Sequence, residues 1–113
     1  MVLNAGWVFL KMRSTKRKNK KPAAWVYAGL ASILRRHLKQ PTQSMKILHE
    51  ATGYHKNKPY LFYHKGFACD ALKQYKQAAL YYRKALVLYK KLNRKPPRWL
   101  EKKLTYSLKK LKK

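Results

Sequence analysis

The sequence predicts an all-α fold in which antiparallel helical hairpins stack, with about five helices behind an extended basic N-terminal arm. First, within residues 59–92, small and bulky side chains alternate at spacings of three and four, which places both classes on one face of each of two helices. Second, prolines and polar residues separate the segments that carry this periodicity. Third, 113 residues allow no more than one domain. We therefore expect an arm at residues 1–22 and a helical domain at residues 23–113.

The arm combines an apolar start with a basic linker. We expect residues 1–10 to form an extended segment that packs Trp7, Phe9 and Leu10 on a neighbour; an organelle-targeting sequence is the alternative. Residues 11–22 would be disordered alone and would order against RNA through phosphate contacts, while a nuclear-localisation signal is the competing interpretation. The candidate RNA-binding residues of this linker are Lys11, Arg13, Lys16, Arg17, Lys18, Lys20 and Lys21.

The first two helices are expected at about 23–39 and 42–52. Pro22 suits a helix start, and Thr42 is a candidate N-cap for the second helix. Gly53 is expected to end that helix as a C-terminal cap. The apolar face of the first helix would consist of Trp25, Ala28, Leu30, Ala31, Leu34 and Leu38, and the inner face of the second of Met45, Leu48 and Ala51.

Two further helices at about 59–72 and 75–92 form the central hairpin, and a last helix runs over about 97–111. Asn93, Pro96 and Pro97 separate the hairpin from the last helix. In the last helix, a single apolar stripe is formed by Leu100, Leu104, Leu108 and Leu111. This stripe should dock on the hairpin and leave a surface of lysines on the other side.

The central stretch resembles a tetratricopeptide repeat, a 34-residue helix–turn–helix unit with small and aromatic residues at set positions. With Pro59 as the first position, the positions 8, 17, 20, 24 and 27 of that pattern hold Gly66, Tyr75, Ala78, Tyr82 and Ala85. A degenerate earlier copy begins at Trp25 and departs from the pattern at Arg35 and Pro41. The resemblance implies a short right-handed solenoid over roughly 25–111, in which residues 97–111 are a basic capping helix.

The resemblance also implies a concave groove that binds a peptide. One subgroup of the family grips acidic C-terminal peptides with Lys and Asn at positions 5 and 9, which here hold Gly29 and Ile33, then Tyr63 and Phe67. That clamp is therefore absent. The groove would instead be apolar and aromatic and would take a hydrophobic segment of a neighbour or of the protein's own arm. Its expected lining is Val26, Ile33, Tyr60, Tyr63 and Phe67.

Charge gives the strongest indication of function. The chain has 29 Lys and Arg but only 3 Asp and Glu, for a net charge of +26, so we expect a polyanionic partner. The favoured interpretation is a structural RNA-binding subunit of a ribonucleoprotein, above all a mitochondrial ribosome in the matrix, that also contacts neighbouring proteins. Beyond the arm, the expected RNA-binding residues are Arg35, Arg36, Lys90, Lys91, Arg94, Lys95, Arg98, Lys102, Lys103, Lys109 and Lys110.

Two other functions remain open. A tetratricopeptide adaptor for a hydrophobic or acidic protein partner is the main alternative. For the compartment, the cytoplasm or another organelle is the alternative to the mitochondrial matrix. Attachment to an anionic membrane surface through the arm is a weaker one. RNA binding should weaken steeply with salt, whereas binding of an apolar peptide should not.

The sequence offers no evident catalytic chemistry, and we expect neither an enzyme nor a cofactor. The four histidines lack metal-ligand spacing, and Glu50, Asp70 and Glu101 lie in separate segments. Cys69 is interpreted as a small core residue, and no apolar run approaches the roughly 20 residues that span a bilayer. Most aromatics are expected in the core; the candidates for stacking on bases are Tyr54, Tyr60 and Trp99.

Overall fold

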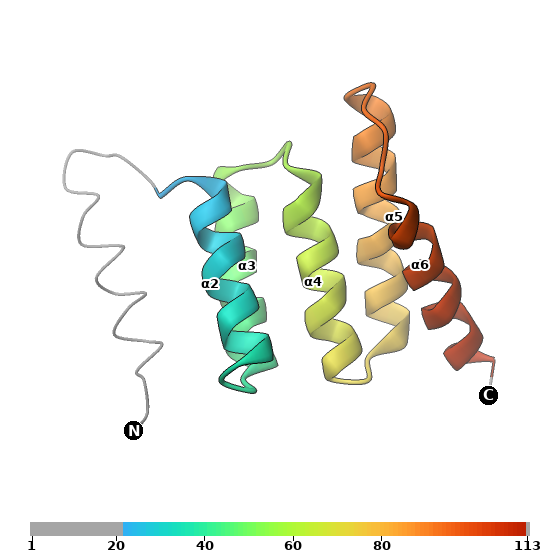
Figure 1. The fold of residues 1–113 in the computed structure, drawn as a ribbon, viewed down its shortest axis with the longest axis horizontal. Coiled ribbons are helices and arrows are strands. Elements are labelled where there is room, and N and C mark those ends of the chain that lie inside the picture. Colours follow the sequence, from blue (N-terminus) through green and yellow to red (C-terminus); the bar gives the residue numbers. More distant parts are fainter. Residues whose placement is uncertain (1–21, 113) are drawn as a thin grey trace.

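The computed structural model describes residues 22–112, and these residues confirm the all-α prediction (Figure 1). The expectations for the apolar and basic arm, including its seven candidate RNA-binding residues, lie outside the described residues. The helices are α2 (Ala24–Arg36), α3 (Pro41–Tyr54), α4 (Pro59–Ala71), α5 (Tyr75–Lys91) and α6 (Arg98–Leu111). The predicted number of helices and the breaks between them are therefore correct within this range.

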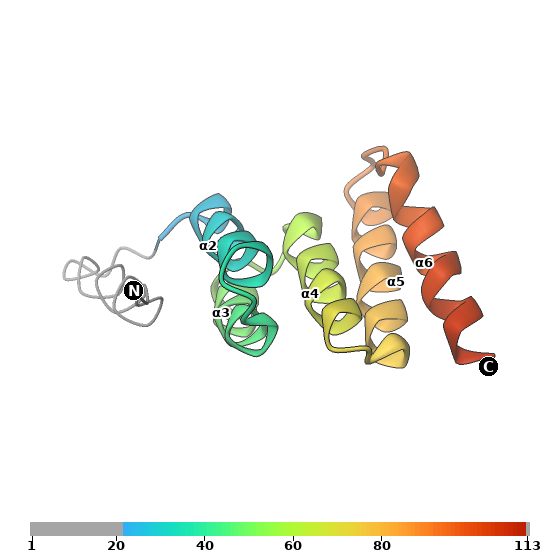
Figure 2. The same cartoon turned by 60° about the horizontal axis from the view of Figure 1, so that its bottom comes forward.

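Consecutive helices run antiparallel and are joined by short loops; α3 lies behind α2 in Figure 1, and α4, α5 and α6 follow beside this pair (Figures 1 and 2). Each helix packs on the next one in the sequence, and α2 also contacts α4. The contact between α2 and α4 is what brings residues of the first hairpin close to those of the second. It therefore decides which side chains of the two hairpins can share a site.

The helix ends differ from the predicted caps. Pro41 is the first residue of α3, because a proline lacks only an N–H that would be unpaired there anyway, so Thr42 is not the N-cap. Helix α3 continues through Gly53 to Tyr54, and no glycine of the described residues has a positive φ. Instead, left-handed residues follow α2, α4 and α5, namely Lys39 (φ 54°), Lys73 (φ 61°) and Asn93 (φ 56°).

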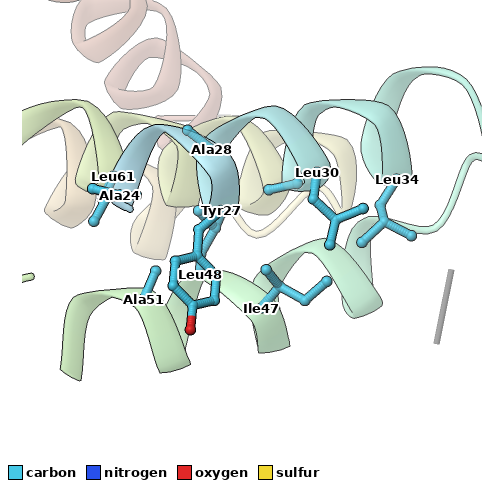
Figure 3. Close-up of a cluster of buried hydrophobic side chains, with 10 residues drawn as sticks. Ala24, Tyr27, Ala28, Leu30, Leu34, Ile47, Leu48, Ala51 and Leu61 are labelled. Atoms are coloured by element: carbon cyan, nitrogen blue, oxygen red, sulfur yellow. The ribbon is translucent and has the colours of Figure 1, made fainter. Parts of the chain in front are cut away.

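The first of two apolar clusters joins α2, α3 and the start of α4 (Figure 3). Tyr27, Leu34 and Ile47 are fully buried in it, and the Tyr27 hydroxyl donates a hydrogen bond of 3.2 Å to Glu50 Oε2 on α3. The predicted place of Trp25 on this face is wrong, since its side chain is 71% exposed. Tyr27 takes the buried position because it lies three, four and seven residues before Leu30, Ala31 and Leu34, on the same helix face, and Glu50 provides an acceptor for its hydroxyl.

The second cluster joins α4, α5 and α6, and one carboxylate links all three helices. Asp70 of α4 accepts hydrogen bonds from the Tyr82 hydroxyl on α5 (2.5 Å) and from the Ser107 hydroxyl on α6 (3.2 Å). Leu100 of the predicted leucine stripe is fully buried, whereas Leu111, the last residue of α6, is 48% exposed. Cys69 is buried here, as predicted, and burial raises the pKa of its thiol to about 11.

Candidate nucleic-acid interface

A cavity of about 520 Å³ opens where α2, α4, α5 and α6 meet, and its volume lies within the range of ordinary ligand pockets. We call it the α4–α6 groove. One residue of α2 and one of α5 contribute to it, together with two stretches from α4 and α6. The lining consists of Arg35, Phe67, Asp70, Ala71, Tyr75, Trp99, Lys102, Lys103 and Tyr106.

Aromatic rings form one wall of the α4–α6 groove. The Trp99 ring lies 5.5 Å from Phe67 at an interplanar angle of 33°, and it meets Tyr63 edge-on at 4.7 Å and 84°. These two contacts fix the orientation of the indole, yet 38% of Trp99 is exposed. Tyr75 and Tyr106 form a second, edge-on pair at 6.3 Å. The groove therefore presents oriented aromatic surface to a ligand.

Two cations approach the same ring from different helices. The Arg35 guanidinium carbon lies 4.9 Å from the centroid of Phe67, and the Lys103 amine lies 5.5 Å from it. Burial and then the neighbouring Arg36 lower the pKa of Arg35 below its ordinary value of 12.5. Cation–π contact with Phe67 partly offsets that burial, but it supplies no full counter-charge. Because Arg35, Lys102 and Lys103 all line the cavity, the arrangement is suited to an anion that enters it.

The structure brings together only part of the predicted peptide groove. Phe67 lines the cavity, and Tyr63 supports Trp99 beside it. Tyr60 instead packs on the first apolar cluster, Ile33 is 48% exposed, and Val26 is half-buried on α2 without lining the cavity. The groove was expected to be apolar and aromatic, whereas this cavity also carries three cations and a carboxylate.

Sequence reasoning did not place α6 in the groove, although a signal was available. The α6 lining residues Trp99, Lys102, Lys103 and Tyr106 follow the helical spacing of three, four and seven. This second stripe runs beside the leucine stripe. What no local pattern reveals is that Arg35, more than 60 residues away in the sequence, faces the same cavity.

The other predicted cations fall into two sets. Three of them line a second cavity of about 550 Å³ where α5 ends and α6 begins, together with Glu101 and three uncharged residues: Lys90, Arg94 and Lys95. We call this cavity the α5–α6 corner. Lys109 lines a third cavity, of about 310 Å³, on α6. The remaining cations are exposed and line none of these cavities: Arg36, Lys91, Arg98 and Lys110. The predicted cations thus form two main groups within the described residues.

One lysine that sequence reasoning passed over is buried. Lys65 of α4 is only 5% exposed, and its amine lies 5.3 Å from the Phe62 ring and 5.2 Å from the Tyr81 ring. The Lys84 amine approaches the same two rings at 6.0 and 5.8 Å. Burial first, and Lys84 second, lower the pKa of Lys65 to about 8. A signal was available in the sequence, because the residues three and four positions away from Lys65 on the same helix face are apolar: Leu61, Phe62, Ala68 and Cys69.

His64 is the other perturbed group. Its Nδ1 is buried and lacks a hydrogen-bond partner among the described residues, and its ring meets Phe67 edge-on at 5.4 Å. Burial, followed by Arg35, lowers the pKa of His64 to about 4, so the imidazole is neutral at pH 7. Within residues 22–112, no cluster of three or more His, Cys, Asp and Glu side chains could hold a metal ion.

The same part of the chain contains no helix whose length and apolar content would let it cross a membrane. Comparisons of the chain with protein-family models, curated proteins and solved structures find no match.

Proposed function

We propose that this protein is a non-catalytic, structural RNA-binding subunit of a large ribonucleoprotein, with a mitochondrial ribosome in the matrix as the favoured assembly. The observation that carries the proposal is the charge, 29 basic against 3 acidic residues. Each phosphate contact releases condensed counterions, which supplies affinity without requiring a base sequence. The subunit would neutralise rRNA phosphates and bridge neighbouring proteins.

The use of the acidic residues supports this proposal. Asp70 and Glu50 accept hydrogen bonds from Tyr82 and Tyr27, which are both fully buried. Two of the three carboxylates thus help to hold helices together. Because so few acids are available, the surface cations need an external anion, and the basic arm, the α4–α6 groove and the α5–α6 corner are the surfaces we assign to RNA.

We further propose that the helices form a tetratricopeptide-like solenoid with α6 as its basic capping helix. The first residues of α3 and α5, Pro41 and Tyr75, are 34 residues apart, as are the left-handed residues Lys39 and Lys73. This interval equals the length of the repeat. The contact of α2 with α4 is also what stacked hairpins require. A rigid array of this kind would hold the cationic surfaces apart.

Binding of RNA as a function of salt tests the proposal. For single-stranded RNA, the logarithm of affinity should fall with the logarithm of salt concentration by about 0.7 per phosphate contacted. Replacing Lys102 and Lys103 with alanine should reduce the magnitude of that slope by about 1.4. The variant Lys56→Ala/Lys58→Ala, in the α3–α4 loop, carries the same charge change and should alter the slope less. Absence of RNA affinity at low salt would refute the proposal.

Co-sedimentation tests the assembly. The protein should remain with ribosomes of the organelle after a high-salt wash, because an integral subunit is also held by its protein neighbours. Release into the free pool at moderate salt would contradict a place as an integral subunit. That outcome would not measure the affinity of the protein for RNA, which the salt titration above tests.

A peptide-binding adaptor is the second candidate, and the aromatic wall of the α4–α6 groove is the observation that favours it. Trp99 and Phe67 offer apolar surface in a cavity large enough for side chains. An apolar peptide that binds there with little salt dependence, from a protein that does not bind RNA, would establish this alternative.

A further inference from the structure

The α4–α6 groove differs from the rest of the basic surface because it joins cations to oriented aromatic rings inside a cavity. We propose that it is a binding site for one unpaired nucleotide of single-stranded RNA, with the base stacked on Trp99 and the phosphate held by Arg35, Lys102 and Lys103. This inference rests on the proposed RNA-binding function. It adds a defined site to what would otherwise be neutralisation of phosphates by surface charge.

Trp99 is already held in place before any ligand arrives. Its edge-on contact with Tyr63 at 4.7 Å and its contact with Phe67 at 5.5 Å restrict the indole, while its exposed part lines the cavity. A fixed ring loses little conformational entropy when a base stacks on it. Stacking of a base on an aromatic side chain does not depend on which base it is, because every base has a π face.

The cations are placed to receive the phosphate of such a nucleotide. Lys102 and Lys103 follow Trp99 by three and four residues, so they lie on the same side of α6. Arg35 reaches the Phe67 ring from α2, and Lys103 reaches the same ring from α6. An anion in the cavity would therefore meet cations from two different helices at once.

Asp70 in the same lining favours a nucleotide over an acidic peptide. Its two oxygens accept hydrogen bonds from Tyr82 and Ser107, and each carboxylate oxygen can accept a second bond. The 2′-hydroxyl of a ribose and the amino groups of bases are donors that could use this capacity. An acidic peptide side chain offers only acceptors, so it could pair with the cations of the groove but has no donor for Asp70. Bases in a duplex are already stacked, so the groove should select unpaired RNA.

The test uses the full chain with a ten-nucleotide single-stranded RNA and a duplex of the same length. Trp99→Ala should weaken binding of the single strand by roughly 5- to 150-fold, the loss expected for one stacked base. Its salt slope should stay unchanged, because no phosphate contact is removed. Trp25→Ala is the matched control, since Trp25 is 71% exposed on α2 and does not line the groove. That control should bind within about twofold of the original protein.

Fluorescence gives a readout that does not depend on the stability of the alanine variant. In a Trp7→Phe/Trp25→Phe background, Trp99 is the remaining tryptophan, and stacking of a base should quench its emission. Lys103→Gln in the same background should reduce the magnitude of the salt slope by about 0.7 and preserve the quenching. Both results together would support the site.

The possible failures can be told apart. If the protein binds RNA with a steep salt slope but Trp99 is neither quenched nor needed, the nucleotide site is refuted while the proposed function stands. Equal quenching by the duplex, or by an acidic peptide that competes with the RNA, would also refute the site. If no RNA binds at any salt concentration, the proposed function fails, and the nucleotide site fails with it.

Discussion

The substitution Gly66→Ala tests a close contact between α4 and α5. A Cβ atom added at Gly66 on α4 would lie 2.7 Å from Cδ1 and 2.8 Å from Cζ of the Tyr82 ring on α5. Real Cβ atoms do not approach other atoms so closely, so the ring or a helix would have to move. The ring has little freedom to move, because Tyr82 is fully buried and its hydroxyl is bonded to Asp70 at 2.5 Å.

Two opposing contributions determine how much Gly66→Ala changes the free energy of unfolding. Overpacking of a well-packed core costs typically 1–3 kcal/mol, and simultaneous contact with several ring atoms indicates the upper part of this range, about 3 kcal/mol. Replacing a mid-helix glycine with alanine gains roughly 0.5–1 kcal/mol of helix propensity. The net loss for Gly66→Ala is therefore about 2 kcal/mol. For a domain of this size, such a loss lowers the melting temperature by roughly 10 °C.

Two other helical glycines provide matched controls. A Cβ at Gly29 on α2 or at Gly53 on α3 meets nothing within 4 Å, so only the propensity term applies. Each of these alanine variants should gain up to about 1 kcal/mol, measured by urea unfolding followed by circular dichroism. If Gly66→Ala proved as stable as the two control variants, the reasoning from the Tyr82 contact would be wrong.

Three further predictions concern the buried polar groups. Lys65→Met should raise the free energy of unfolding at pH 7 by about 1–3 kcal/mol, because it removes a buried charge without a carboxylate partner. The pKa of Lys65 is about 8 in the folded state and 10.5 in the unfolded state, so the unfolded chain binds more protons between pH 8 and 10. The original protein should therefore gain stability over this pH range. Urea titrations at several pH values should show this rise in the original protein and not in Lys65→Met. The pKa of His64 is about 4 in the folded state and 6.5 in the unfolded state, so the unfolded chain binds more protons between these pH values. The free energy of unfolding should therefore fall by up to about 3 kcal/mol from pH 6.5 to 4. His64→Phe should remove most of this fall in the same urea titrations. Asp70→Ala should lower the free energy of unfolding by about 3 kcal/mol at pH 7, because it leaves the Tyr82 and Ser107 hydroxyls without their acceptor. Tyr82→Phe should cost less in the Asp70→Ala background than it costs in the original protein. Additive losses of the two substitutions in urea unfolding would contradict the shared bond.

Helix positions could be predicted from the sequence because periodicity and prolines are local signals. The helix caps could not be predicted in the same way. Capping rules state only which residue types are preferred at a helix end, whereas the packing of the surrounding chain determines at which residue the helix ends. Thr42 and Gly53 have the right side chains for caps, yet Pro41 begins α3 and the helix continues through Gly53. The left-handed conformation falls on Lys39, Lys73 and Asn93, where backbone hydrogen bonds such as Gln40 N to Leu34 O stabilise the turn.

The candidate site could be predicted only in part, for a related reason. Trp99 was recognised as a stacking candidate and its neighbouring lysines as RNA contacts, because both properties belong to individual residues. Their meeting with Arg35 and Phe67 depends on how α2 packs on α4, which no spacing within one helix encodes. The burial of Tyr27 instead of Trp25, by contrast, follows from spacing within α2, since Tyr27 and not Trp25 precedes Leu30, Ala31 and Leu34 by three, four and seven residues.

The position of Asp70 connects the fold to the proposed function. This carboxylate joins α4, α5 and α6, and it is also the acid among the residues that line the α4–α6 groove. It faces three cations in the lining, namely Arg35, Lys102 and Lys103, so one carboxylate leaves the groove with a net positive charge. The groove must therefore stay cationic for as long as the helices stay packed, and an anion bound there adds to the stability of the same helix contacts. A protein of net charge +26 repels itself when free, so its folded state should be most stable with its polyanion bound.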